Sequence, residues 1–202
     1  MPPKPKFTRE QVVDAALELV SKKGIEALTA RELGTQLGSS ACPIFTAFKN
    51  MEELQKEVQT AAMKRFEAFV AQAEDDMPAF KRLGMQMVRF GTEEPKLFQL
   101  LFMRENEVPR TFEDIFEQLG NMAEVSIEVI ESNYNLRSRD AKTLFEHIWI
   151  YTFGLGALSA TKVCHFTEEE ISQMLTGAFT GFMMLVKSDG KQNRMEDKYV
   201  KD

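Results

Sequence analysis

Cysteine and histidine are scarce in this chain, and neither is arranged as a metal site. The two cysteines, Cys42 and Cys164, have no CxxC or Cys/His partner spacing, so neither a zinc site nor a disulfide framework is indicated. Only two histidines occur, and there is no phosphate-binding glycine loop, no HExxH and no GxSxG motif. We therefore expect reduced thiols, no metal, no cofactor and no enzymatic activity.

Long apolar runs are also missing. No run approaches the roughly 18 residues that a membrane-spanning helix needs, and the first six residues carry no apolar stretch after their charges. Hydrophobic residues make up 44% and charged residues 28% of the chain, which is an ordinary balance for a globular protein. The sequence predicts a cytoplasmic protein with no membrane partner.

Strand patterns are absent, because glycine and proline occur singly and apolar residues recur at helical spacing. We therefore predict an all-α fold. Four residue pairs match the helix-capping arrangement: Thr8 with Gln11, Thr29 with Glu32, Asn50 with Glu53, and Thr167 with Glu170. The expected helices span residues 9–23, 30–37, 41–48, 50–70 with an end at 75–78, 79–91, 95–103, 112–133, 141–164 and 168–187.

The net charge of −6 is unevenly distributed along the chain. Residues 1–50 carry seven basic and five acidic side chains, a charge of +2 that leaves −8 for the remaining residues. A small basic head on an acidic body suits a protein that touches a polyanion with one end only.

Residues 30–48 have the pattern of a helix-turn-helix unit. The first short helix ends at Gly38, which can take the positive φ that a tight turn demands. Ser39 and Ser40 are the expected caps of the second helix, and Pro43 falls within its first turn. Four apolar residues face inward at helical spacing, namely Leu33, Leu37, Ile44 and Phe48. The second helix of such a unit enters the major groove of DNA.

Three stretches carry a family resemblance: Ile25-Glu-Ala-Leu-Thr-Ala-Arg-Glu-Leu-Gly34, Leu37-Gly-Ser-Ser-Ala-Cys-Pro-Ile-Phe-Thr-Ala-Phe48 and Asn50-Met-Glu-Glu-Leu54. With them, the region from Thr8 to Leu54 resembles the DNA-binding domain of the tetracycline-repressor (TetR) family. The resemblance implies an obligate dimer whose helical second domain binds a small ligand and shifts the spacing of the two DNA-reading helices. We expect a helix-turn-helix DNA-binding domain with a basic arm at residues 1–50, a helical ligand-binding and dimerisation domain at 51–187, and a flexible polar tail at 188–202.

Carried over position by position, the resemblance implies nine DNA-contacting residues. They lie at the start of the second helix and on the reading helix or its end: Thr29, Arg31, Ser40, Ala41, Cys42, Pro43, Phe45, Thr46 and Lys49. Arg31 and Lys49 can neutralise phosphates, and Thr46 can meet a thymine methyl or a base edge. The alternative is that Thr29 and Ser40 are simple helix caps and that Arg31 is a solvated surface charge.

The reading surface departs from the family pattern at three positions. Phe45 stands where a tyrosine is often seen, Ala47 where a histidine is often seen, and Met51 where a lysine often heads the next helix. Each change removes a polar contact to DNA. Apolar contacts can replace it, as can an arm carrying Lys4 and Lys6 in a neighbouring groove; the alternative for this arm is plain disorder.

Phenylalanine and methionine are abundant, with 16 and 12 residues, most of them after residue 60. Core packing explains such a surplus, and so does a cavity for apolar or aromatic ligands. We predict a ligand pocket formed by Phe66, Phe90, Phe98, Phe102, Met103, Phe116, His147 and Tyr151. His147, Trp149 and Tyr151 would offer polar tips, although a core histidine with a satisfied hydrogen bond is an equal alternative.

Small residues recur at four-residue spacing in the last two expected helices: Gly156 with Ala160, Ala157 with Thr161, and Gly177 with Gly181. Such stripes let helix backbones approach closely. We predict a homodimer through these two helices. A dimer also holds two heads at the separation of about 34 Å that paired half-sites demand.

Two functions remain open. The first is a ligand-responsive transcriptional regulator, a repressor released from a palindromic double-stranded DNA operator by a small apolar or aromatic effector. The second is a helical interaction module with a degenerate head, which the changes at Phe45, Ala47 and Met51 favour. Salt-dependent binding to a palindromic DNA fragment separates them.

Overall fold

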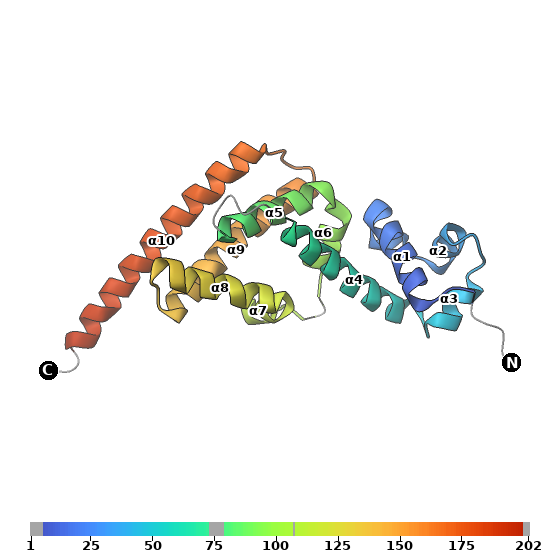
Figure 1. Cartoon of the computed structure of the whole chain (residues 1–202), viewed down its shortest axis with the longest axis horizontal. Coiled ribbons are helices and arrows are strands. Elements are labelled where there is room, and N and C mark those ends of the chain that lie inside the picture. Colours follow the sequence, from blue (N-terminus) through green and yellow to red (C-terminus); the bar gives the residue numbers. More distant parts are fainter. Residues whose placement is uncertain (1–5, 73–78, 107, 200–202) are drawn as a thin grey trace.

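The computed structural model of the protein describes residues 6–72, 79–106 and 108–199. Within these ranges every regular element is a helix, which confirms the all-α fold. The elements are α1 (Arg9–Lys23), the 3-10 turn η1 (Ile25–Ala27), α2 (Ala30–Gln36), α3 (Cys42–Ala47), α4 (Met51–Ala71), α5 (Ala79–Glu93), α6 (Pro95–Phe102), α7 (Phe112–Leu119), α8 (Asn121–Tyr134), α9 (Ser138–Ala160) and α10 (Glu168–Tyr199). Figure 1 shows an elongated molecule with α1–α3 at one end, the end of α10 at the other, and α4 leading between head and body.

The helices begin where the local capping signals predict. The four capping residues each accept a hydrogen bond from the backbone N–H three residues later: Thr8, Thr29, Asn50 and Thr167. At Thr8 the arrangement is reciprocal, because the Gln11 side chain accepts from the Thr8 N–H at 3.0 Å. The Asn50 side chain accepts from the Glu53 N–H at 2.8 Å, which fixes the start of α4.

The single helix expected at residues 112–133 is wrong, because the chain breaks there into α7 and α8. Gly120 takes φ 53° and ψ −133°, a conformation that no helix interior contains. The start of α7 carries a capping box that our sequence analysis did not identify, formed by Thr111 and Asp114. Apolar spacing continues through Gly120, so periodicity alone did not reveal the break.

The expected ends of the last two helices are also corrected. Helix α9 ends at Ala160 rather than at Cys164, and Lys162 takes a positive φ of 59° in the turn that follows. Helix α10 continues to Tyr199, past the expected end at residue 187. Residues 188–199 lack an apolar stripe but contain no proline, so the helical backbone continues without a periodic signal. The expected end of α4 at residues 75–78 lies outside the described residues.

Helices α5 and α9 pack closely at the centre of the body, because each has a glycine at the point of contact. A Cβ atom added to Gly91 would lie 2.7 Å from the carbonyl oxygen of Gly156, and one added to Gly156 would lie 2.7 Å from the Phe98 ring. Ala160 is buried as well. The predicted dimer role of the Gly156 and Ala160 pair is therefore wrong, since both residues pack inside one protomer. No helix in the described part of the chain has the length and apolar character to cross a membrane.

Candidate DNA-binding surface and effector cavity

The α2–turn–α3 unit is held together by a short turn between two buried faces. Gly38 takes φ 60°, and the Ser39 N–H donates to the Gly34 carbonyl at 2.9 Å. The turn passes so close to α2 that a Cβ on Gly34 would lie 3.1 Å from the Ser39 carbonyl oxygen. Leu33, Ile44 and Phe48 are buried, as predicted, and Leu37 is half-buried against the same core. These contacts fix α3 against α1 and leave its opposite face in solvent.

The nine predicted DNA-contacting residues lie together on α2, the turn and α3. Most are exposed, and only Ala41 and Pro43 are half-buried. Phe45 is the largest apolar group among them, with 49% of its surface exposed. The expected serine cap of α3 is wrong, because Ala41 is the N-cap and no side chain caps this helix. Ser39 instead accepts a hydrogen bond from the Lys6 ammonium group at 3.2 Å.

Arg9 joins α1 to the ends of α3 and α4, a role that our sequence analysis did not identify. Its guanidinium donates to the Ala47 carbonyl at 2.8 Å and lies 4.2 Å from the centre of the Phe48 ring. It also forms ion pairs with Glu53 at 2.9 Å and Glu57 at 3.0 Å. These contacts hold the end of α3 and the start of α4 against α1.

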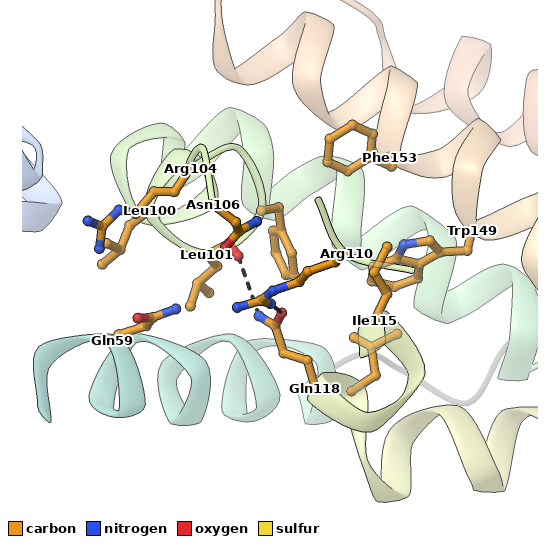
Figure 2. Close-up of a pocket in the computed structure, with 12 residues that line it drawn as sticks. Gln59, Leu100, Leu101, Arg104, Asn106, Arg110, Ile115, Gln118, Trp149 and Phe153 are labelled. Atoms are coloured by element: carbon orange, nitrogen blue, oxygen red, sulfur yellow. Dashed lines mark hydrogen bonds between the residues drawn. The ribbon is translucent and has the colours of Figure 1, made fainter. Parts of the chain in front are cut away.

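The body contains a cavity of about 270 Å³ between α4, α6, α7, α9 and the segment that joins α6 to α7 (Figure 2). Its apolar lining comes from Leu100, Leu101, Phe102, Ile115, Leu119, Trp149 and Phe153. Its polar lining comes from Gln59, Arg104, Asn106, Arg110 and Gln118. In Figure 2 Arg110 points at Gln118, whose side-chain oxygen accepts its hydrogen bond. The site thus combines apolar and polar lining residues, as small-molecule sites do.

A charged cluster connects the cavity helix α6 to the head. The Arg65 guanidinium of α4 pairs with Glu18 of α1 at 2.9 Å and with Glu94, the residue that caps α6. The Ser21 hydroxyl of α1 donates to the same Glu94 carboxylate at 3.0 Å. Burial lowers the pKa of Arg65, but its two carboxylate partners together raise this pKa by more, so the net shift is upward. The charges therefore stay paired across the junction of α1, α4 and α6.

Comparison with known proteins identifies the head. Residues 12–58 match the family described as bacterial regulatory proteins of the tetR family. The head of the chain is therefore similar to the DNA-binding head of this family. It is 24% identical over 134 residues to the HTH-type transcriptional regulator YvkB of Bacillus subtilis (strain 168), covering 59% of this chain and 70% of YvkB.

Solved structures extend the likeness of fold to the body of the chain. A TetR-family transcriptional regulator from Vibrio parahaemolyticus superposes with a TM-score of 0.60 and 17% identity, over 85% of this chain and 96% of that one. A TetR-like transcriptional regulator from Rhodococcus sp. RHA1 gives a TM-score of 0.60 and 15% identity, over 85% and 93% of the two chains. These structures show the fold of the whole chain, and the match at residues 12–58 is to the head of bacterial regulatory proteins.

The ligand residues predicted from the sequence mostly lie outside the cavity of the body. Phe102 lines it, and Met103 is exposed in a separate hollow between α6 and η1. Phe66, Phe90 and Phe98 are fully buried and pack edge to face with neighbouring rings. These aromatic residues at helical spacing therefore belong to the hydrophobic core and do not line the cavity.

The remaining three predicted ligand residues pack between helices. Phe116 is buried against Phe145, and His147 stacks on Phe182 with ring centres 5.0 Å apart. Tyr151 packs beside a small apolar cluster formed by α5, α9 and α10. Of the three side chains expected to offer a polar group to the ligand, His147, Trp149 and Tyr151, only Trp149 lines the cavity. The polar lining residues that we did not predict lie largely in the segment after α6, where no periodicity marks them.

Replacing Glu53 with glutamine should reduce the acid sensitivity of this protein's stability. Hydrogen bonds from the Lys49 N–H and then from Arg9 hold the pKa of Glu53 below its ordinary value near 4.5. A carboxylate with a lowered folded-state pKa stabilises the protein above the unfolded-state pKa, and this contribution is lost as the pH falls through the folded-state value. The melting temperature of Glu53→Gln should therefore be lower at neutral pH and approach the wild-type value as the pH falls through the lowered pKa of Glu53.

Glu52→Gln is the matched control for this measurement. Glu52 lies on the same turn of α4 but is exposed and pairs only with Lys56, at 3.4 Å, among the described residues. The melting temperature of Glu52→Gln should therefore depend on pH as that of the wild type does. Parallel profiles for wild type and Glu53→Gln would contradict the role given to Glu53.

Proposed function

We propose that this regulator is a repressor that leaves a palindromic operator when a small effector fills the cavity. The strongest support is that α6 lines the cavity and begins at Glu94, which bonds both Ser21 and Arg65 at the base of the head. A ligand that favours another position of α6 would act on α1 and α4 through these contacts. In a dimer, that movement changes the spacing of the two reading helices.

The head supplies two kinds of contact to DNA in this proposal. The exposed Arg31 and Lys49 side chains neutralise phosphates, and the hydroxyls of Thr29 and Ser40 add phosphate contacts. The remaining residues face the groove, namely Ala41, Cys42, Pro43, Phe45 and Thr46. The exposed Phe45 ring suits contact with thymine methyl groups, so apolar readout takes the place of a tyrosine hydroxyl.

The basic arm supports the same surface. Lys6 contacts Ser39 in the turn before α3, so this lysine lies next to the reading helix. From there an arm can reach an adjacent groove. Lys4, the other basic residue of this arm, lies outside the described residues.

The outer faces of α9 and α10 support a homodimer. A Cβ atom added to Gly154, Gly177 or Gly181 would meet no atom within 4 Å. Ile150 on α9 and Met184 on α10 are 54% and 68% exposed on the same open faces. Small residues beside exposed apolar side chains favour close packing of the last two helices with those of a second copy. The proposed domains remain 1–50 and 51–187, and the proposed tail from residue 188 begins as helix.

Arg31→Ala should weaken binding to every DNA sequence by roughly tenfold and reduce the salt dependence of binding, because it removes a phosphate contact from each head. Thr46→Ala should instead change the preferred base at one position of each half-site, because Thr46 is exposed on α3. The measurement is a binding-site selection followed by fluorescence anisotropy over a range of salt concentrations. Lys64→Ala is the control, because Lys64 is exposed in the middle of α4. It should change neither the DNA affinity nor the preferred DNA sequence.

Identical selected motifs for wild type and Thr46→Ala would exclude a reading role for Thr46. An interaction module without DNA binding is the second candidate, since Ala47 and Met51 are half-buried and Met51 packs on the core. If the purified protein prefers no palindromic fragment near its own gene at moderate salt, that second candidate replaces the repressor.

A further inference from the structure

We propose that the cavity takes a small carboxylate-bearing effector with one aromatic ring or a short apolar tail. This inference rests on the proposed use of the cavity as the effector site. Arg104 and Arg110 both line it, and among the described residues no carboxylate does. A guanidinium presents a planar fork of donors that matches a carboxylate, so the lining is complementary to a monoanion.

The carboxylates at the start of α7 are already used elsewhere. Asp114 accepts hydrogen bonds from the Thr111 N–H at 2.6 Å and from the Thr111 hydroxyl at 2.7 Å. These bonds are the largest causes of the lowered pKa of Asp114, and the charge of Arg110 is the smallest. Glu113 pairs with Lys142 at 2.6 Å. Among the described residues, neither Arg104 nor Arg110 forms an ion pair, so both charges are available to a ligand.

The polar and apolar groups of the cavity are arranged as two opposed sides. Arg110 donates to the neutral Gln118 amide, whose nitrogen donates to the Leu101 carbonyl at 3.4 Å (Figure 2). Trp149 and Phe153 of α9 form an aromatic wall away from these amides. The volume of about 270 Å³ lies near the lower end of small-molecule sites, which suits one ring beside one charged group.

Trp149 makes the test direct, because it is the only tryptophan of the chain and it lines the cavity. Cyclohexanecarboxylate and cyclohexylmethanol have the same ring and differ in the anionic group, so their binding is compared by the change in Trp149 fluorescence. The acid should bind at least about tenfold more tightly than the alcohol, as a charge-assisted hydrogen bond requires. Its advantage should shrink as salt screens the exposed guanidinium groups.

Arg104→Gln and Arg110→Gln should each weaken binding of the acid about tenfold and leave the alcohol unchanged. Arg104→Gln leaves the bond between Arg110 and Gln118 in place, so it tests the charge even if Arg110→Gln disturbs the cavity. Arg139→Gln is the control, since Arg139 is exposed on α9 outside the lining.

Three results would overturn the proposed ligand class. The first is equal affinity for the two probes, and the second is no fluorescence response to the acid. The third is an equal loss of affinity for both probes in the two arginine variants. Release of operator DNA is measured separately by anisotropy. Acid binding that leaves the DNA complex intact would support the anion site and contradict the effector function. DNA release by the alcohol alone would support the effector function and overturn the anion preference.

Discussion

Gly181→Arg is expected to convert the proposed dimer to a monomer and to weaken binding to a palindromic DNA fragment at least about 100-fold. Gly181 lies on the open face of α10, with nothing within 4 Å of an added Cβ, so the substitution should not disturb the protomer itself. In the dimer it would place two arginines where the α10 helices approach each other. Without the second head, binding loses the high effective concentration that linkage provides.

The molar mass in solution, the melting temperature and the DNA affinity of this variant are measured together. Ser132→Arg adds the same side chain to an exposed position of α8, outside the two helices of the proposed interface, and should stay dimeric with wild-type affinity. A Gly181→Arg protein that keeps the wild-type molar mass would place the dimer interface elsewhere. A monomeric wild type that still prefers a palindrome would contradict the dimer itself.

The head could be predicted in detail because its determinants are local. A cap such as Thr8 or Asn50 acts on the backbone three residues away, and a turn glycine such as Gly38 acts at its own position. The Arg9 cluster was not predictable in the same way. Its partners, Glu53 and the Ala47 carbonyl, lie 44 and 38 positions away in the chain, and no spacing rule joins them.

The effector cavity was harder to predict, because core and cavity use the same kinds of side chain. Phe98 and Phe102 lie on the same short helix and touch each other, yet only Phe102 lines the cavity. Periodicity places a residue on the inner face of a helix but does not say whether that face meets a ring or an empty volume. The charged groups that distinguish the cavity, Arg104 and Arg110, lie outside the helices and have no periodic signal.

The glycines of α9 show the same limit. Gly154 and Gly156 are two positions apart, and the predicted dimer stripe contained Gly156 but not Gly154. The structure separates them, because Gly154 faces open space while Gly156 meets Gly91 and Phe98. A sequence pattern thus identifies where close packing occurs, whereas the partner depends on how α5, α6 and α9 are placed.

Gly156→Ala is expected to lower the free energy of unfolding by about 2 kcal/mol, because the overpacking cost exceeds the gain in helix propensity of about 1 kcal/mol. The added Cβ would lie 2.7 Å from two atoms of the Phe98 ring. That ring is fully buried and packs edge to face on Phe102 at 5.1 Å, so it cannot turn away freely. For a chain of this length the melting temperature should fall by roughly 4–8 °C.

Phe98→Leu supplies the decisive comparison, because a smaller side chain at this position makes room for the added methyl group. The double variant should lose less stability than the sum of the two single variants, with a coupling of about 1 kcal/mol. Gly154→Ala, on the same helix but with no atom within 4 Å of its added Cβ, is the matched control and should be neutral or slightly stabilising. Additive losses in the double variant, or an equal loss in Gly154→Ala, would show that the close contact between Gly156 of α9 and Phe98 of α6 does not determine the stability of the body.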